Sequence, residues 1–257
     1  MRFDYYTTTD KGDFRKSNQD CAYAATSADG TAFFGIVCDG MGGLSHGEVA
    51  SSTVVESFTE WFTKEFATIQ RDELFADNVA LGWQRIITDT NERLRQMSSK
   101  DQQSMGTTLS VLLLTQDRFY AAQIGDSRIY VGNEAEEFFV ALTKDHSYVA
   151  DMVEQGLMTA EQARVSNEKN ILTRCIGVMR EVQADYYDGE LHSGDFFVIC
   201  SDGFCSGTLP SDILRAMGLH GSNKQFSQQA LETAVRNRRA AGERDNITAV
   251  LTAVNGE

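Results

Sequence analysis

The chain has 257 residues, of which 42% are hydrophobic and 23% are charged, an ordinary composition for a globular protein. Its 23 Lys and Arg residues against 37 Asp and Glu residues give a net charge of −14. Nucleic-acid affinity depends on Lys and Arg displacing counterions from phosphates, and anionic lipid repels an acidic surface, so we expect neither nucleic acid nor membrane as a partner.

The hydrophobic pattern predicts strands and helices in a definite order. Strands are expected at 22–26 and 31–38, joined by an Asp29-Gly30 turn. Helices are expected at about 47–67 and 72–98, the first with an apolar residue every four positions from Ala50 to Phe66. Further strands are expected at 108–115, 119–124, 127–131, 137–142, 183–187, 196–200 and 246–254, and further helices at 148–166, 211–217 and 224–240.

These elements favour one fold class. Helices occur in pairs between runs of strands and do not alternate with them strand by strand, which argues against a doubly wound parallel sheet. An α+β architecture, with antiparallel sheet packed against helix pairs, fits better. The single proline, Pro210, leaves no room for a proline-rich linker. We expect one domain over 1–257, with 148–170 projecting from it.

The cysteines and the first residues indicate a compartment. The five cysteines include no CxxC pair, which is typical of reduced thiols rather than of a disulfide framework. The segment MRFDYYTTTDKGD has no apolar run of the kind found in a signal peptide, and no stretch approaches the ~18 apolar residues of a membrane span. We expect a cytoplasmic protein.

Four aspartates stand where apolar strands are expected to end or begin. Asp39 follows FFGIVC, Asp202 follows FFVICS, Asp126 follows AAQIG, and Asp245 precedes the last strand. Carboxylates gathered at ~4 Å repel each other by about 1 kcal/mol per pair in water and about 4 at an effective dielectric near 20. Divalent cations relieve this repulsion, and oxygen ligands suit Mg²⁺ or Mn²⁺. After Asp39, Gly40 permits close approach of a backbone carbonyl as a further ligand.

The alternative for such aspartates is a set of unrelated turns. We keep that interpretation for Asp29-Gly30 and Asp188-Gly189. Arg15 lies in a polar stretch before the first hairpin, where its guanidinium suits capture of phosphate, although a plain surface charge is the alternative. Asp20 closes that stretch and is placed to orient a metal-bound water without being a ligand.

Taken in order, these motifs resemble those of the metal-dependent protein serine/threonine phosphatases, the type 2C or PPM family. The similarity runs from residue 10 to residue 248, and the DGMGG form is similar to that of bacterial members. The matching segments are DKG and RKSNQD within 10–20, VCDGMGG at 37–43, GTT at 106–108, GDSRIY at 125–130, LTKDHS at 142–147, LTR and Gly within 172–177, GDFFVICSDG at 194–203 and RDNIT at 244–248.

The resemblance implies a four-layer α/β/β/α sandwich, with two central antiparallel sheets flanked by helix pairs, and two Mn²⁺ or Mg²⁺ ions at one end of the sheets. By position, Asp39 would bridge both ions and Gly40 would bind one through its carbonyl. Asp202 and Asp245 would hold the other ion. Asp126, with Asp202, matches the position that holds a third, weaker ion in bacterial members.

The resemblance also implies an activity. A metal-bridging hydroxide would attack the phosphorus of phosphoserine or phosphothreonine in line, with Arg15 binding the phosphate. The segment 148–170 matches a flap beside the site. The partners implied are phosphoproteins, including a serine/threonine kinase and its substrates, whose phosphorylation the enzyme would oppose. We expect a monomer.

One departure from the family pattern concerns the general acid. Many bacterial relatives carry histidine directly after DGMGG, where this chain has Leu44, and histidine comes two residues later as His46. His46 is therefore a candidate acid, with a surface residue at a helix start as the alternative. Two other functions stay open from sequence: a catalytically weak regulatory module that binds phosphoproteins, and a two-metal hydrolase of small phosphoesters.

Overall fold

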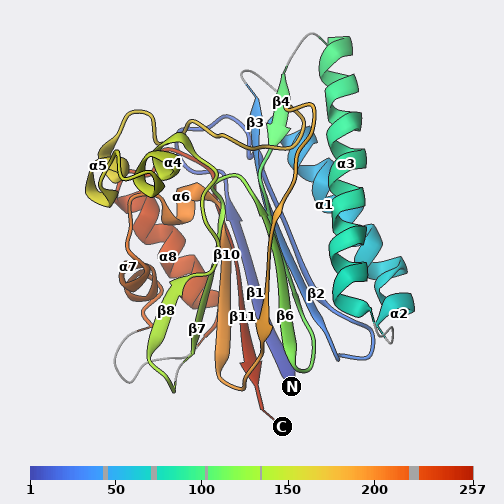
Figure 1. Ribbon diagram of the computed structural model, residues 1–257. Helices are drawn as coiled ribbons and strands as arrows, with labels where there is room; N and C mark the ends of the chain where they lie inside the picture. The colour runs from blue at the N-terminus through green and yellow to red at the C-terminus, as the bar shows by residue number, and fades with distance from the viewer. Residues whose placement is uncertain (43–45, 71–73, 102–103, 134, 220–225, 257) are drawn as a thin grey trace.

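Two antiparallel sheets stack face to face between two layers of helices in the computed structural model (Figure 1). The structure describes residues 1–42, 46–70, 74–101, 104–133, 135–219 and 226–256. The first sheet has the order β1 (Arg2–Asp10), β11 (Ile247–Asn255), β10 (Asp195–Cys200), β7 (Arg128–Asn133) and β8 (Phe138–Ala141). The second has the order β2 (Asp20–Thr26), β3 (Phe33–Gly42), β5 (Leu109–Leu114), β6 (Arg118–Ile124) and β9 (Asp185–Glu190), with β4 (Met105–Thr107) paired to the end of β3.

The helices cover the outer faces of the two sheets and one end of the sandwich (Figure 1). On the second sheet lie α1 (Gly47–Lys64), α2 (Phe66–Ile69) and α3 (Phe75–Asp101), and on the first lie α7 (Pro210–Ala216) and α8 (Gln228–Ala240). Three short helices, α4 (Tyr148–Glu154), α5 (Ala160–Val165) and α6 (Asp202–Cys205), lie at the end of the sandwich away from both termini. No helix in the described ranges is both long enough and apolar enough to cross a membrane.

The core has three layers because each central strand is apolar on both faces. In β3, Phe34 and Ile36 pack toward α1 and α3, whereas Phe33 and Val37 pack against the other sheet. Successive side chains of a strand point to opposite faces, so one apolar run fills two layers. Cys38 shares the helix-facing side with Phe34, away from the inter-sheet layer.

The expected fold class is confirmed, and each expected strand and helix has a counterpart within a few residues. The helix expected at 148–166 is two helices, α4 and α5. No strand was expected at 2–10, where β1 buries only Phe3 fully but pairs with β11 along its whole length, from Arg2 opposite Asn255 to Asp10 opposite Ile247. Its partner lies at the far end of the chain, so local periodicity carried no signal for it.

Two details of the sequence analysis were wrong. The expected Asp188-Gly189 turn lies inside β9, where Gly189 faces Phe119 across the sheet and a Cβ would come within 2.6 Å of that ring. This glycine makes room for an aromatic ring rather than for a turn. The strand expected to end at Cys38 continues as β3 through Gly42, so Asp39 lies within the strand and not after it.

Candidate active site

Strand register brings the first two candidate carboxylates together. Asp20, at the start of β2, is directly opposite Asp39 in β3. The Oδ2 atom of Asp20 accepts a hydrogen bond of 2.8 Å from Ser201 Oγ, which lies just before α6 in the other sheet's layer. Asp202 is the next residue. The hydroxyl of Ser201 therefore links Asp20, in the second sheet, to the segment after β10 of the first sheet that carries Asp202.

The pKa values show that five aspartates share one electrostatic environment. Burial, followed by the charges of Asp20, Asp202, Asp126 and Asp245, raises the pKa of Asp39 well above its usual value. Burial also raises the pKa of Asp20 to about 7 and that of Asp202 to about 6, with further increases from neighbouring carboxylates. The same causes, burial and then the charge of Asp202, raise the pKa of Asp126. Crowded, dehydrated carboxylates of this kind favour protonation or a cation.

The backbone of Asp39 is fixed by two threonines at the junction of β4 and β5, Thr107 and Thr108. Its carbonyl accepts hydrogen bonds of 2.9 Å from Thr107 Oγ1 and Thr108 N, and its N–H donates to Thr108 Oγ1 at 2.8 Å. Thr108 Oγ1 also lies 2.7 Å from Ser127 Oγ. This chain of bonds ties Asp39 to the loop between β6 and β7, and Asp126 belongs to that loop.

The residue after Asp39 lies where no side chain fits. A Cβ added to Gly40 would lie 2.1 Å from the carbonyl oxygen of Gly47, at the first turn of α1, and 2.6 Å from that of Gln19. The Gly40 N–H donates to Gln19 O at 3.1 Å. The start of α1 therefore packs directly onto the backbone beside Asp39, which explains the glycine at this position.

Arg15 is brought to the same group of carboxylates. Its Nη2 atom lies 2.5 Å from Asp245 Oδ2, and the hydrogen bond to Asp245, with added effects from the charges of Asp39 and Asp202, raises the pKa of the guanidinium. The loop that carries it is held by Asn246, whose side chain accepts from Gln19 N at 2.9 Å and donates to Lys11 O at 2.8 Å. In this structure Arg15 is an ion-pair partner of a candidate ligand, and half of its side chain is exposed.

His46 directly precedes Gly47, which packs onto Gly40 beside Asp39, but its side chain makes no described bond to the aspartates. It is the N-cap residue of α1, its side chain makes no capping hydrogen bond, and it is partly exposed. Within the described ranges, no hydrogen bond or ion pair joins its ring to any of the five aspartates. Leu44, the position where many bacterial relatives have histidine, lies outside the described residues.

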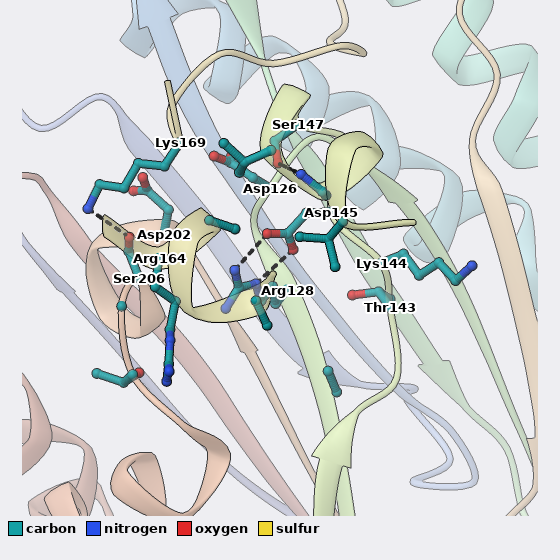
Figure 2. A pocket seen from close by; sticks show the side chains of 18 of the residues that line it. Asp126, Arg128, Thr143, Lys144, Asp145, Ser147, Arg164, Lys169, Asp202 and Ser206 are labelled. Carbon is teal, nitrogen blue, oxygen red and sulfur yellow. Dashed lines mark hydrogen bonds and ion pairs between the residues drawn. The ribbon is translucent and has the colours of Figure 1, made fainter. Parts of the chain in front are cut away.

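Two adjoining cavities open beside Asp202. One, of about 460 Å³, is bounded by α4, α5 and β7 (Figure 2). The other, of about 630 Å³, contains Arg15 and Asp245. Both are lined by Lys169, whose Nζ atom reaches Ser206 Oγ at 3.5 Å beside Asp202, as Figure 2 shows. The end of the expected flap segment, 148–170, therefore faces the site from both cavities.

The donor set fits hard divalent cations. Within the described residues, no three His, Cys, Asp or Glu side chains are already arranged as a metal site. The Oδ1 atoms of Asp20 and Asp202 are nevertheless buried with no hydrogen-bond partner. A buried polar atom without a partner is costly. A cation would satisfy the oxygen of Asp202, a water bound to that cation would satisfy the oxygen of Asp20, and the positive charge would relieve the repulsion around Asp39. The ligands available are oxygens, which Mg²⁺ and Mn²⁺ prefer.

Sequence reasoning overlooked two residues that hold this site together, Ser201 and Asn246. Each directly neighbours a candidate aspartate, and each is almost fully buried. The sequence signal for both residues was their position, because each is a polar residue directly next to an aspartate at the end of a strand. Its partners, Asp20 for Ser201 and the 11–19 loop for Asn246, come from distant parts of the chain and become identifiable only in the folded structure.

Comparison with known proteins identifies the family. The protein phosphatase 2C family profile matches residues 15–252. The chain is 33% identical over 252 residues to the protein phosphatase PhpP of Streptococcus pneumoniae, covering 97% of this chain and 96% of that protein. It is 29% identical over 245 residues to the serine/threonine phosphatase stp of Listeria monocytogenes, covering 95% and 92%.

Solved structures agree with this. The serine/threonine phosphatase of S. agalactiae superposes with a TM-score of 0.85 at 29% identity, covering 98% of this chain and 100% of that one. The catalytic domain of the phosphatase PstP, solved in complex with two manganese ions, gives a TM-score of 0.80 at 25% identity and covers 99% of each chain. With the family profile covering nearly its whole length, the chain belongs to the protein phosphatase 2C family and is a serine/threonine protein phosphatase of that type.

Proposed function

We propose that this phosphatase hydrolyses phosphoserine and phosphothreonine at a centre of two Mn²⁺ or Mg²⁺ ions held by Asp39, Gly40, Asp202 and Asp245. The observation that carries the proposal is the gathering of largely buried carboxylates around Asp39, several of them with raised pKa values, next to an arginine and with Asp202 lining two cavities. The two manganese ions in the PstP structure support the same ion count. Asp126 would contribute, with Asp202, to a third and weaker site.

The chain's own residues have separate tasks in this reaction. When bound, the cations would lower the pKa of the attacking water and stabilise negative charge on the phosphoryl oxygens. Arg15, which is half exposed, would exchange its contact with Asp245 for the substrate phosphate, because a planar guanidinium binds a phosphate with two parallel hydrogen bonds. Asp20, held by Ser201, would orient a water beside Asp39.

The proposal extends to partners and compartment. The substrates would be phosphoproteins of a serine/threonine kinase signalling system, and possession of the whole set of carboxylates favours catalysis over a weak regulatory role. A cytoplasmic monomer with one catalytic domain over 1–257 and a flap at 148–170 remains our prediction. Hydrolysis of small phosphoesters is the second activity to be measured, since the cavity lined by Arg15 and Asp245 has a volume of about 630 Å³, comparable to the pockets that hold small molecules.

The test is phosphate release from a phosphothreonine peptide and from an aryl phosphate, with Mn²⁺ or EDTA. We expect Mn²⁺-dependent turnover of both substrates. Asp39→Asn should lower the rate by about 100-fold or more, because the variant would lack the negative charge that Asp39 would supply to the cations. Asp89→Asn, an exposed aspartate on α3, is the matched control. An inactive wild-type protein in millimolar Mn²⁺, or an active Asp39→Asn variant, would refute the proposal.

A further inference from the structure

A largely buried ion pair lies beside two of the candidate ligands and lines the same cavity as they do. Arg238, near the end of α8, pairs with Glu243 in the loop that leads to β11, and the two side chains are only 14% and 19% exposed. The guanidinium also donates from Nε to Gly203 O at 3.0 Å and from Nη2 to Ser206 O at 3.1 Å. These carbonyls belong to α6 and its end, the segment that begins with Asp202.

The carboxylate of Glu243 reaches the other candidate ligand. One of its oxygens, Oε2, accepts from Arg238, and the other, Oε1, accepts from Arg244 N at 2.8 Å and from Asp245 N at 3.1 Å. Each side of the ion pair is thus hydrogen-bonded to the backbone of one aspartate-bearing segment. The pair is a continuous bridge from the α6 backbone to the amide of Asp245.

The two segments that this bridge joins are packed closely and repel each other. A Cβ added to Gly203 would lie 2.0 Å from Asn246 O and 3.4 Å from the Cβ of Asp245. Asp202 and Asp245 both carry carboxylates, and Glu243 adds a third negative charge nearby. The four-residue helix α6 is not stable by itself, because short helices depend on tertiary contacts. It therefore needs such contacts to keep its position against this repulsion.

We propose that Arg238 and Glu243 act as positioning residues that fix the distance between Asp202 and Asp245 and so prepare this pair for a divalent cation. The inference rests on the proposed function, in which both aspartates hold metal. Residues that hold ligands through hydrogen bonds typically change metal affinity by 10- to 100-fold when altered. Neither Arg238 nor Glu243 would bind the ion or the substrate itself.

The experiment measures Mn²⁺ affinity directly, by titration calorimetry of metal-stripped protein, so that activity is not the readout. We expect Arg238→Ala to weaken Mn²⁺ binding at least tenfold. Arg238→Lys should recover only part of the lost Mn²⁺ affinity. An ammonium group cannot donate hydrogen bonds to two carbonyls and a carboxylate in the geometry of a guanidinium. Arg236→Ala is the matched control and should bind Mn²⁺ as the wild type does. Arg236 is an exposed arginine on the same helix, and among the described residues its side chain is bonded only to Thr233.

A double-mutant cycle tests whether the pair acts as a unit. Arg238→Ala combined with Glu243→Ala should weaken Mn²⁺ binding no more than the stronger of the two single changes, because residues in one network are not additive. Should Arg238→Ala fail to fold, Glu243→Gln takes its place: it keeps the side-chain volume but removes the negative charge facing Arg238, and a several-fold weaker affinity is expected.

The outcomes separate this inference from the proposed function. Melting temperatures in EDTA report the structural role of the ion pair alone. If Arg238→Ala lowers that temperature but keeps wild-type Mn²⁺ affinity, the pair is structural and the inference is overturned. Additive losses in the double variant overturn it as well. A wild-type protein that binds no Mn²⁺ refutes the proposed function, whereas wild-type binding with an unaffected Arg238→Ala variant refutes only the inference.

Discussion

Single carboxylates in this site have acid–base properties that their residue type does not predict. The pKa of Asp20 is raised from 3.8 to about 7, chiefly by burial. In the metal-free protein the folded state therefore holds this proton more tightly than the unfolded state does. The resulting contribution to stability is complete below about pH 4 and is lost as the pH rises through about 7.

We therefore expect the metal-free protein to lose stability between about pH 5 and pH 7.5 more steeply than its Asp20→Asn variant, in which the side chain is neutral throughout. Thermal melts in EDTA across this range give the comparison. Parallel curves for the two proteins would mean that Asp20 titrates near its ordinary value. Asp89→Asn, which alters an exposed carboxylate, should follow the wild type.

A single substitution can test whether His46 is the general acid. We expect His46→Ala to leave the pH dependence of kcat unchanged, since the imidazole makes no capping bond and no described contact with the aspartates. The measurement is a pH–rate profile on the phosphothreonine peptide in saturating Mn²⁺. Loss of the alkaline limb in the variant would instead establish His46 as the general acid, because that limb reports the group that must be protonated.

At the scale of elements, the loop before β2 depends on one amide side chain. Asn246, 2% exposed, bonds to the backbone of Gln19, Lys11 and Ser17, at 2.9, 2.8 and 3.2 Å. These bonds connect the beginning of β11 to the loop that carries Arg15. The position of the arginine is thus set by a residue more than two hundred positions away in the sequence.

Asn246→Ala should lower the free energy of unfolding by about 1–3 kcal/mol, because buried backbone groups lose their partners. It should also raise KM for the phosphopeptide, since the Arg15 loop loses its anchor. Urea unfolding and steady-state kinetics measure the two effects. Asn237→Ala, which removes one exposed bond to Ala216 O, should change both by far less. An unchanged KM would show that Asn246 is not needed to position Arg15.

At the scale of the whole molecule, metal binding should stabilise the fold. Mn²⁺ at about 100 times its dissociation constant should add about 2.7 kcal/mol by linkage, because the folded state holds the site and the unfolded chain does not. The melting temperature in Mn²⁺ against EDTA is the measurement. In the Asp202→Asn variant, Mn²⁺ should raise the melting temperature far less than in the wild type, while the variant should still melt cooperatively in EDTA. No shift in the wild type would argue against sites formed by the fold.

Much of the architecture could be predicted from sequence because its signals are local. The stripe from Ala50 to Phe66 predicted one helix, which the structure divides at Glu65 into α1 and the short α2. The apolar runs before Asp39 and Asp202 predicted β3 and β10. Helix pairs between strand runs then imply antiparallel sheets. The turn at Asp29-Gly30 was also correct, whereas Asp188-Gly189 was not, because a glycine beneath an aromatic ring and a glycine in a turn look alike in sequence.

The sequence alone determined which residues are candidates for the chemistry, namely the aspartates beside apolar strands and Arg15 before the first hairpin, and which family they resemble. The tertiary structure alone decided which of them meet. Asp20 contacts Ser201 across 181 positions, and Arg15 contacts Asp245 across 230. Periodicity reports on neighbours within a few residues, whereas burial, raised pKa values and the Arg238–Glu243 bridge arise from strand register and packing between distant segments. For that reason Asp245, far from Asp39 in sequence, lies in the candidate site, while the ring of His46, close to Asp39 in sequence, makes no described hydrogen bond or ion pair to the aspartates.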